Sequence, residues 1–228
     1  MAEDRHSKAL DAELIADPDE RAKREVRNGL KQFDTVVEMI DYWLQPERPF
    51  KLRLSAILHL HRVALEGISV YAGNFRPAGI KIGGSQHQPV GAHLVPEEIE
   101  RFCDYVNDHW AKKSAIHLAA YALWRLNWIH PFADGNGRTA RAVSYLILCV
   151  RLGDRLPGRN TIPEQIAGDK GPYYRALEEA DQAFKHGKVD LSAMEGILSD
   201  LLARQLLSVH AAATAGEGTT PTEPRMFH

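Results

Sequence analysis

Two apolar stretches separated by one short polar segment constrain the fold of this chain more than any other feature. Residues 114–129 (SAIHLAAYALWRLNWI) are apolar almost all round a helix, and residues 142–150 follow the same pattern. A helix that is apolar on nearly every side belongs inside a protein core. Neither stretch reaches the roughly 18–20 apolar residues that are needed to cross a bilayer. We therefore expect two central buried helices, joined by the polar segment 130–141.

Amphipathic patterns surround this pair, with apolar residues at three- and four-residue steps that are typical of helices. They lie at residues 30–44, 54–65, 96–110, 173–184 and 191–202. The first of them has an apolar face that consists of Leu30, Phe33, Val37, Ile40 and Leu44. Residues 72–95 instead carry repeated Gly and Pro around a short Ile80-Lys81-Ile82 alternation, which predicts a β-hairpin. The expected fold is all-α, a helical bundle with one small β-hairpin.

The length of 228 residues suits a single domain with short extensions. Residues 1–20 are charged and are expected to form an N-terminal arm. Residues 211–228 are rich in Ala, Gly, Thr and Pro without periodicity, which predicts a disordered tail. The domain itself is expected at residues 21–210.

Charge and cysteine content narrow the class of protein. The 28 basic and 30 acidic side chains give a net charge of −2, without the basic excess that is typical of nucleic-acid or acidic-lipid binding. Cys103 and Cys149 are too few for a disulfide framework and fit a reducing compartment. The N-terminus lacks the apolar segment of a signal peptide. We therefore expect a cytoplasmic protein with no nucleic-acid or membrane partner, while secretion as an effector stays open.

The segment 130–141, H-P-F-A-D-G-N-G-R-T-A-R, combines a base, a carboxylate, two glycines, an amide and two arginines. A helix that begins near Arg138 would point its free amides and its positive end at an anion in this loop. Arg138 and Arg141 are three residues apart and would share one helix face, which suits a polyphosphate. Asp134 is the single carboxylate that Mg²⁺ uses when phosphates supply further ligands. His130 is then placed to act as a general base.

This segment resembles, position for position, the signature H-x-F-x-[D/E]-G-N-G-R-x-x-R of the Fic domain family. Three further elements outside it also resemble the family: A-G-N-F-R at residues 72–76, I-G-G-S at residues 82–85 and Y-Y-R-A-L at residues 173–177. The resemblance extends from about residue 20 to residue 209. It implies a mostly helical enzyme with a flap over its active site, which transfers AMP from ATP to a hydroxyl of a target protein and requires Mg²⁺.

The resemblance also implies a role for each matching residue of the segment. His130 would deprotonate the target hydroxyl, and Asp134 would hold Mg²⁺ against the α- and β-phosphates. Arg138 would bind the phosphates and Arg141 the γ-phosphate. Phe132 would be structural. The anion hole would be formed by Gly135, Asn136 and Gly137.

Outside the segment, the resemblance implies that the flap docks the target protein by main-chain pairing. The flap residues are Lys81, Ile82, Gly83 and Gly84. Tyr173 and Tyr174 would lie near the nucleotide base, although their helical spacing fits core positions equally well. His87 and His93 could contact a target, but solvated loop histidines are the simpler interpretation.

Several alternatives stay open. A related enzyme could transfer UMP, GMP or phosphocholine, could transfer a γ-phosphate or could remove AMP from a target. Phosphorylating relatives replace the second Gly of G-N-G with Lys, and Gly137 argues against that variant. A non-enzymatic alternative is an interaction module whose flap binds a peptide strand.

Regulation is a separate question. Many family members carry an inhibitory [S/T]-x-x-x-E-[G/N] motif, whose Glu pairs with the last arginine of the signature. Residues 62–67, 24–29 and 192–196 imitate this motif without matching it. We therefore expect that any inhibition comes from an antitoxin-like partner or from a homo-oligomer.

Overall fold

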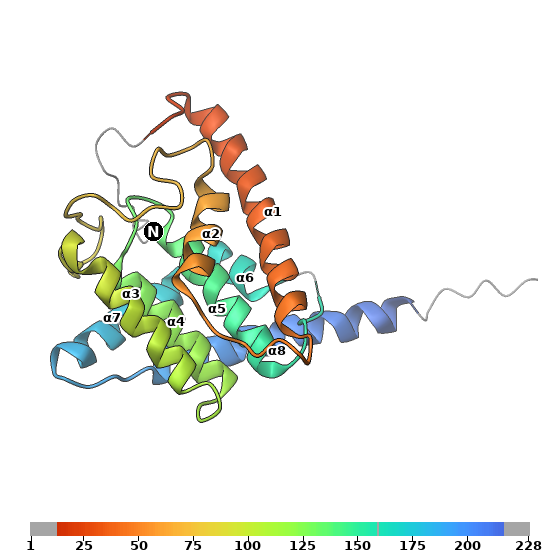
Figure 1. Ribbon diagram of the computed structural model, residues 1–228. Helices are drawn as coiled ribbons and strands as arrows, with labels where there is room; N and C mark the ends of the chain where they lie inside the picture. Colours follow the sequence, from red (N-terminus) through yellow and green to blue (C-terminus); the bar gives the residue numbers. More distant parts are fainter. Residues whose placement is uncertain (1–12, 159, 217–228) are drawn as a thin grey trace, which may run out of the picture.

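The computed structural model describes residues 13–158 and 160–216, and this part of the chain is mostly helical (Figure 1). The helices are α1 (Pro18–Trp43), α2 (Leu54–Leu65), the 3₁₀ turn η1 (Ala92–Leu94), α3 (Val95–Asp108), α4 (Ala115–Ile129), α5 (Asn136–Leu152), α6 (Ile162–Gly168), α7 (Gly171–Lys185) and α8 (Ser192–Gly216). The expected all-α fold is confirmed.

Helices α4 and α5 form the centre of the bundle, as their apolar sequences predict. They pack against each other along their length, α1 and α2 cover α5, and α3, α7 and α8 cover α4. Trp124 of α4 is 1% exposed and Leu146 of α5 is fully buried. The short loop between these two helices is therefore held at both ends by the best-packed part of the molecule.

Helix α1 begins as the sequence suggests, but its buried face differs from the prediction in its N-terminal half. The Asp17 carboxylate accepts hydrogen bonds from the main-chain N–H groups of Asp19 and Glu20, and caps the helix. Leu30 belongs to the predicted core face, yet it is 66% exposed, and Asn28 and Gln32 are buried instead.

Hydrogen bonds explain why amides replace leucine on the buried face of α1. The Asn28 side chain donates to the main-chain oxygens of Ala64 and Glu66 at 3.2 and 2.9 Å. The Gln32 side chain donates to that of Leu60 at 3.0 Å. The Asn28 donor satisfies carbonyls at the C-terminal end of α2, which a purely apolar face could not do, whereas the carbonyl that Gln32 reaches lies within the helix. The predicted α1 face was therefore wrong at Leu30, whereas Ile40 is fully buried and Phe33 and Leu44 pack against the core as predicted.

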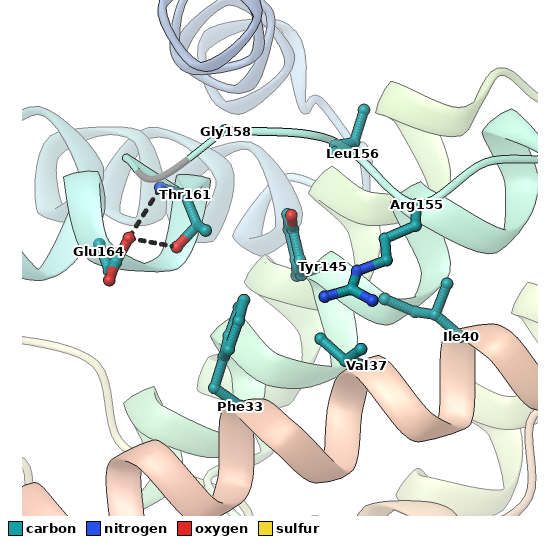
Figure 2. Close-up of a pocket in the computed structure, with 9 residues that line it drawn as sticks. All are labelled: Phe33, Val37, Ile40, Tyr145, Arg155, Leu156, Gly158, Thr161 and Glu164. Atoms are coloured by element: carbon teal, nitrogen blue, oxygen red, sulfur yellow. Dashed lines mark hydrogen bonds between the residues drawn. The ribbon is translucent and has the colours of Figure 1, made fainter. Parts of the chain in front are cut away.

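Apolar residues of α1 border a pocket of about 350 Å³ (Figure 2). The pocket lies between α1, α5 and the connection to α6, and its lining consists of Phe33, Val37, Ile40, Tyr145, Arg155, Leu156, Gly158, Thr161 and Glu164. None of the residues 130–141 lines this pocket, so it is separate from the polar loop.

Residues 72–95 form an irregular loop instead of the predicted hairpin. Between the two ends of this segment no strand forms, and η1 is its single regular element. Pro77 and Pro89 lack the N–H group that a ladder needs, and an isolated two-stranded hairpin is only marginally stable. Side-chain hydrogen bonds from Arg76 and His87 hold the loop in its place, as described below.

The ends of the domain differ in part from the prediction. Helix α1 begins at Pro18, inside the predicted arm, and α8 continues to Gly216, past the predicted start of the tail at residue 211. Residues 1–12 and 217–228 lie outside the described residues, so the rest of the arm and of the tail stays a prediction. In the described part of the chain, no helix is both long and apolar enough to span a membrane.

Candidate active site

The loop between α4 and α5 brings His130 to the end of one buried helix and Asn136 to the start of the next. His130 adopts a left-handed conformation with φ of 52°, the single positive φ among the described residues other than glycine. Pro131 follows it and disfavours a helical residue at this position. Phe132 is fully buried, which confirms its structural character. The main chain at His130 is therefore strained, and the packing of α4 and α5 maintains it.

Hydrogen bonds fix the tautomer of His130. Its Nδ1 lies 3.2 Å from the main-chain oxygen of Asn127, which can only accept, so Nδ1 carries the proton. Nε2 is then the unprotonated nitrogen of the neutral ring and can accept a proton. The Asn127 side chain in turn donates to the hydroxyl of Tyr173 at 2.7 Å. The ring of His130 thus has the orientation and tautomer that a general base requires.

Arg76 is a buried positioning residue that sequence reasoning did not single out. Its side chain is almost inaccessible, and burial lowers the pKa of its guanidinium. Nε donates to the main-chain oxygen of His130 at 2.8 Å, while the two Nη atoms donate to those of Ala78 and Val90. Its own N–H donates to the oxygen of Pro131 at 2.9 Å. Arg76 therefore joins the His130 turn to both ends of the irregular loop.

Asn136 and Gly135 shape the start of α5. The Asn136 side chain accepts from the N–H of Phe132 at 2.9 Å and donates to the oxygen of the same residue at 2.8 Å. Gly135 has φ of 76°, and a Cβ there would lie 2.4 Å from Leu65 Cδ2, so only glycine fits. Both polar atoms of the Asn136 side chain are therefore engaged within the loop, and its main-chain N–H is the group that could bind an anion.

The first turn of α5 presents donors and two arginines to the loop. The first helical hydrogen bond runs from the N–H of Thr139 to the oxygen of Gly135, so the N–H groups of residues 136–138 have no acceptor within the helix. Arg138 is partly exposed in the same turn. A Cβ on Gly137 would lie 3.3 Å from Nη1 of Arg141, which places Arg141 beside the glycine turn. The expected cradle of amides and arginines is thus brought together.

The Asp134 carboxylate accepts from three donors. Oδ1 accepts from the N–H of Gly135 at 2.5 Å. Oδ2 accepts from Arg138 at 3.3 Å and from Arg21 at 2.9 Å. Arg21 belongs to the first turn of α1, which the sequence analysis did not connect with the site. Asp134 therefore faces one arginine from α5 and one from α1.

His61 also holds the loop through hydrogen bonds, and the sequence analysis did not assign it a role in the site. Its Nδ1 accepts from the N–H of Gly73 at 3.0 Å, so Nε2 carries the proton and donates to the main-chain oxygen of Asp134 at 3.0 Å. The ring stacks on Phe132 with centroids 3.7 Å apart. Burial lowers the pKa of His61 to about 4, because the charged ring would lose its hydration and the charge of Arg138 opposes it. His61 is thus a neutral, doubly hydrogen-bonded support for the loop.

The flap residues form a turn at Gly83 and Gly84, closed by a hydrogen bond from the N–H of Ser85 to the oxygen of Ile82 at 3.4 Å. Ile82 is buried, whereas Lys81, Gly83 and Gly84 are exposed. His87 is not a solvated loop residue as expected: its side chain is 7% exposed, and Nε2 donates to the main-chain oxygen of Trp128 at 2.7 Å. This bond joins the flap to the end of α4, next to His130.

Of the two tyrosines, Tyr173 is buried in the core with 2% exposure, and Tyr174 is partly exposed. Their ring centroids lie 5.5 Å apart on α7. Tyr173 contacts the site through Asn127, whose main-chain oxygen accepts from His130. A place near the nucleotide base stays a prediction for both residues.

Asp134 is the one acidic side chain within the loop segment 130–141. The described residues hold no group of three or more His, Cys, Asp and Glu side chains that could bind a metal. Asp134 alone fits the type of Mg²⁺ site in which one carboxylate and substrate phosphates share the ion. The adjacent amides and arginines are suited to hold those phosphates. The residues therefore fit Mg²⁺ together with a polyphosphate and do not form a complete metal site by themselves.

The sequence also matches a known family. Residues 51–148 match the family model of the Fic/DOC family. The protein adenylyltransferase Fic of Drosophila persimilis is 35% identical over 100 residues, which cover 43% of this chain and 19% of that protein. The protein adenylyltransferase fic-1 of Caenorhabditis elegans is 32% identical over 123 residues, which cover 53% and 24%. The matched part thus spans about a fifth to a quarter of these curated relatives.

Solved structures agree in fold. Fic-1 of C. elegans (residues 134–508) is similar with a TM-score of 0.66 and 25% identity, covering 88% of this chain and 55% of that one. A Fic domain containing signaling protein of Bacteroides thetaiotaomicron has a TM-score of 0.64 at 22% identity, covering 86% and 75%. The matched residues 51–148 contain the whole loop with its His, Asp and Arg side chains, so the loop lies in the part of the chain that is similar to the Fic/DOC family.

Proposed function

We propose that this protein is a protein adenylyltransferase, which transfers AMP from ATP to a Ser, Thr or Tyr hydroxyl of a target protein. The observation that carries the proposal is the arrangement around one loop. His130, with Nε2 as its proton acceptor, lies at the end of α4, and Arg138 lies in the first turn of α5. The curated relatives that match this region bear the name protein adenylyltransferase, which supports the same reaction.

The chemistry is a displacement at the α-phosphorus of ATP. The target hydroxyl loses its proton to Nε2 of His130, and its oxygen forms a bond to the α-phosphorus. The bond from that phosphorus to the oxygen bridging the α- and β-phosphates breaks, and pyrophosphate leaves. General-base help of this kind contributes about 10²–10⁴-fold to a rate. The target then carries AMP on its hydroxyl, so atoms and charges balance.

The remaining residues bind and orient ATP. The N–H groups at residues 136–138 would hold phosphate oxygens, and the positive end of α5 would favour their charge. Arg138 and Arg141 would add charge-assisted hydrogen bonds to the phosphates. Bound magnesium, with Asp134 as its protein ligand, would supply neutralisation of the phosphate charge. Fixed donors of this kind are effective because they need no reorganisation during the reaction.

We also propose that the exposed segment at Lys81, Gly83 and Gly84 docks the target protein. The segment contains an exposed turn and is joined through His87 to the end of α4, so a target strand that pairs with its main chain would come close to His130. The irregular main chain still offers N–H and C=O groups for pairing, because it forms no ladder of its own.

The position of Glu66 does not favour a role as the inhibitory glutamate. The Glu66 side chain is 66% exposed and faces Lys31 at 3.9 Å, at the outer end of α2. We infer that inhibition, where it occurs, comes from an antitoxin-like partner or from a homo-oligomer. If Glu66→Gly switches on an otherwise silent purified protein, this inference is wrong.

The experiment that tests the function uses ATP labelled at the α- or at the γ-phosphate. Wild-type protein, His130→Ala and the control His59→Ala, which changes an exposed histidine of α2, are incubated with Mg²⁺ and a cell lysate. We expect protein labelling from α-labelled ATP only, with wild type and His59→Ala but not with His130→Ala. Labelling from γ-labelled ATP would show phosphorylation and contradict the proposal.

A further inference from the structure

The first turn of α1 reaches the loop between α4 and α5 through a single arginine. Arg21 lies among three carboxylates, at 2.7 Å from Glu13, 3.1 Å from Glu25 and 2.9 Å from Asp134. Its side chain is 16% exposed, and Arg138 contacts Asp134 and Glu25 at 3.3 and 3.8 Å. Burial lowers the pKa of Arg21, but these carboxylates outweigh that effect and raise it. Arg21 is therefore a permanent positive charge inside the site.

This contact occupies the atom that a cation would need. Oδ1 of Asp134 is turned back onto the N–H of Gly135, whereas Oδ2 faces the arginines. Arg138 lies in the phosphate cradle and can exchange Asp134 for a phosphate oxygen. Arg21 comes from another helix, 113 residues away in the sequence. A divalent cation on Oδ2 would meet the like charge of Arg21 at close range, so the two compete for one oxygen.

We propose that Arg21 gates metal entry: its guanidinium takes the place of the divalent cation on Asp134 and has to withdraw before a metal–nucleotide complex binds. This inference rests on the proposed function, because it assumes that Asp134 binds a metal shared with ATP. Glu13 and Glu25 make the withdrawal feasible, since they retain Arg21 as an ion pair after it leaves Asp134. The contact between Arg21 and Asp134 thus raises the metal concentration that is needed to fill the site.

The test measures metal binding without any target protein. Mn²⁺ replaces Mg²⁺ as a spectroscopic probe with the same preference for oxygen ligands. The Mn²⁺ that the full-length protein retains is measured by its paramagnetic resonance after rapid ultrafiltration, which removes free Mn²⁺ and the free Mn²⁺–analogue complex, with and without a saturating non-hydrolysable ATP analogue. The variants are Arg21→Gln and Arg21→Met, which both remove the charge. Arg21→Lys keeps it, and Arg27→Gln removes an exposed charge two turns along α1 as the matched control.

If Arg21 competes with the metal, either neutral variant binds Mn²⁺ in the presence of the analogue about tenfold more tightly than wild type, the factor for one modest charge-assisted hydrogen bond. Arg21→Lys and Arg27→Gln stay within about twofold of wild type. Two neutral variants of different shape are used, so a folding failure of one leaves the other as the test, with melting temperatures measured alongside.

Two results would contradict the proposed gate. Unchanged or weaker Mn²⁺ binding in a folded neutral variant would show that Arg21 braces the loop, and would overturn the gate while leaving the proposed function intact. If neither wild type nor the variants bind Mn²⁺ with the analogue, the proposed function fails and the gate falls with it.

Discussion

His61 gives the domain a pH-dependent stability that can be worked out from its surroundings. The buried ring has a pKa of about 4, against an ordinary value of 6.5 in the unfolded chain. The unfolded chain therefore binds more protons at His61 between these two values. Stability from this group is fully present above pH 6.5 and is lost as the pH falls toward 4. A shift of this size corresponds to about 3 kcal/mol of unfolding free energy.

The structural cause is the pair of hydrogen bonds at the two ring nitrogens. Protonation places an N–H on Nδ1, where the N–H of Gly73 already points, so a hydrogen bond becomes a repulsion. The bond from Nε2 to the Asp134 main chain survives, but the ring can no longer satisfy both neighbours. Acid should therefore loosen the loop before it unfolds the rest of the bundle.

The assay is urea unfolding, followed by tryptophan fluorescence, at a series of pH values from 4.5 to 7.5. Wild type is compared with His61→Gln, which offers one donor and one acceptor but cannot be protonated in this range. His59→Gln, an exposed change on the same helix, is the control. We expect wild type and the control to lose about 2 kcal/mol more than His61→Gln between pH 7 and pH 4.5. Parallel pH dependence in all three proteins would refute the reasoning.

Further substitutions test the loop residue by residue. Gly135→Ala is expected to destabilise the protein by about 2–4 kcal/mol in urea unfolding, because its Cβ would overlap buried Leu65 and its φ is positive; a loss below about 1 kcal/mol would contradict this. Asn136→Ala should cost about 1–3 kcal/mol, since it leaves both main-chain groups of Phe132 without their partner, and unchanged urea stability would refute it. Arg138→Ala should weaken ATP binding about tenfold or more in calorimetric titration and slow turnover, whereas unchanged nucleotide affinity would count against the proposed cradle.

The centre of the fold could be predicted because its information is local. Residues 114–129 and 142–150 are apolar on almost every side, and no arrangement other than a buried helix pair accommodates both. The loop between them joins adjacent helix ends, so His130 and Arg138 come together whatever the rest of the chain does. The residues of the signature therefore lie in one loop between two buried helices, and their roles stay predictions.

The residues that hold the loop from outside could not be predicted from the local sequence pattern. Arg21, His61 and Arg76 reach the loop from remote parts of the chain, and nothing in the local pattern marks them as its neighbours. The A-G-N-F-R element did include Arg76, but only as a resemblance and without a role. His61 lies on the apolar face of its helix, where a histidine is most often a core residue.

Two structural predictions failed for physical reasons that periodicity does not contain. The buried face of α1 carries Asn28 and Gln32, which donate to main-chain carbonyls of α2, and the apolar residue Leu30 is left exposed. The alternation at residues 80–82 predicted a hairpin, yet these residues form no strand in the structure. In both cases the hydrogen bonds that the main chain can form, and not the pattern of apolar residues, determined the local structure.

The central claim is that His130 transfers a proton during the reaction and does not hold the nucleotide. The most direct measurement compares wild type with His130→Ala in two quantities, the rate of AMP transfer from α-labelled ATP and the affinity for ATP by calorimetric titration. We predict that transfer falls by about 10²-fold or more, while ATP affinity stays within about twofold of wild type. Retained transfer, or ATP affinity that falls together with transfer, would contradict the account.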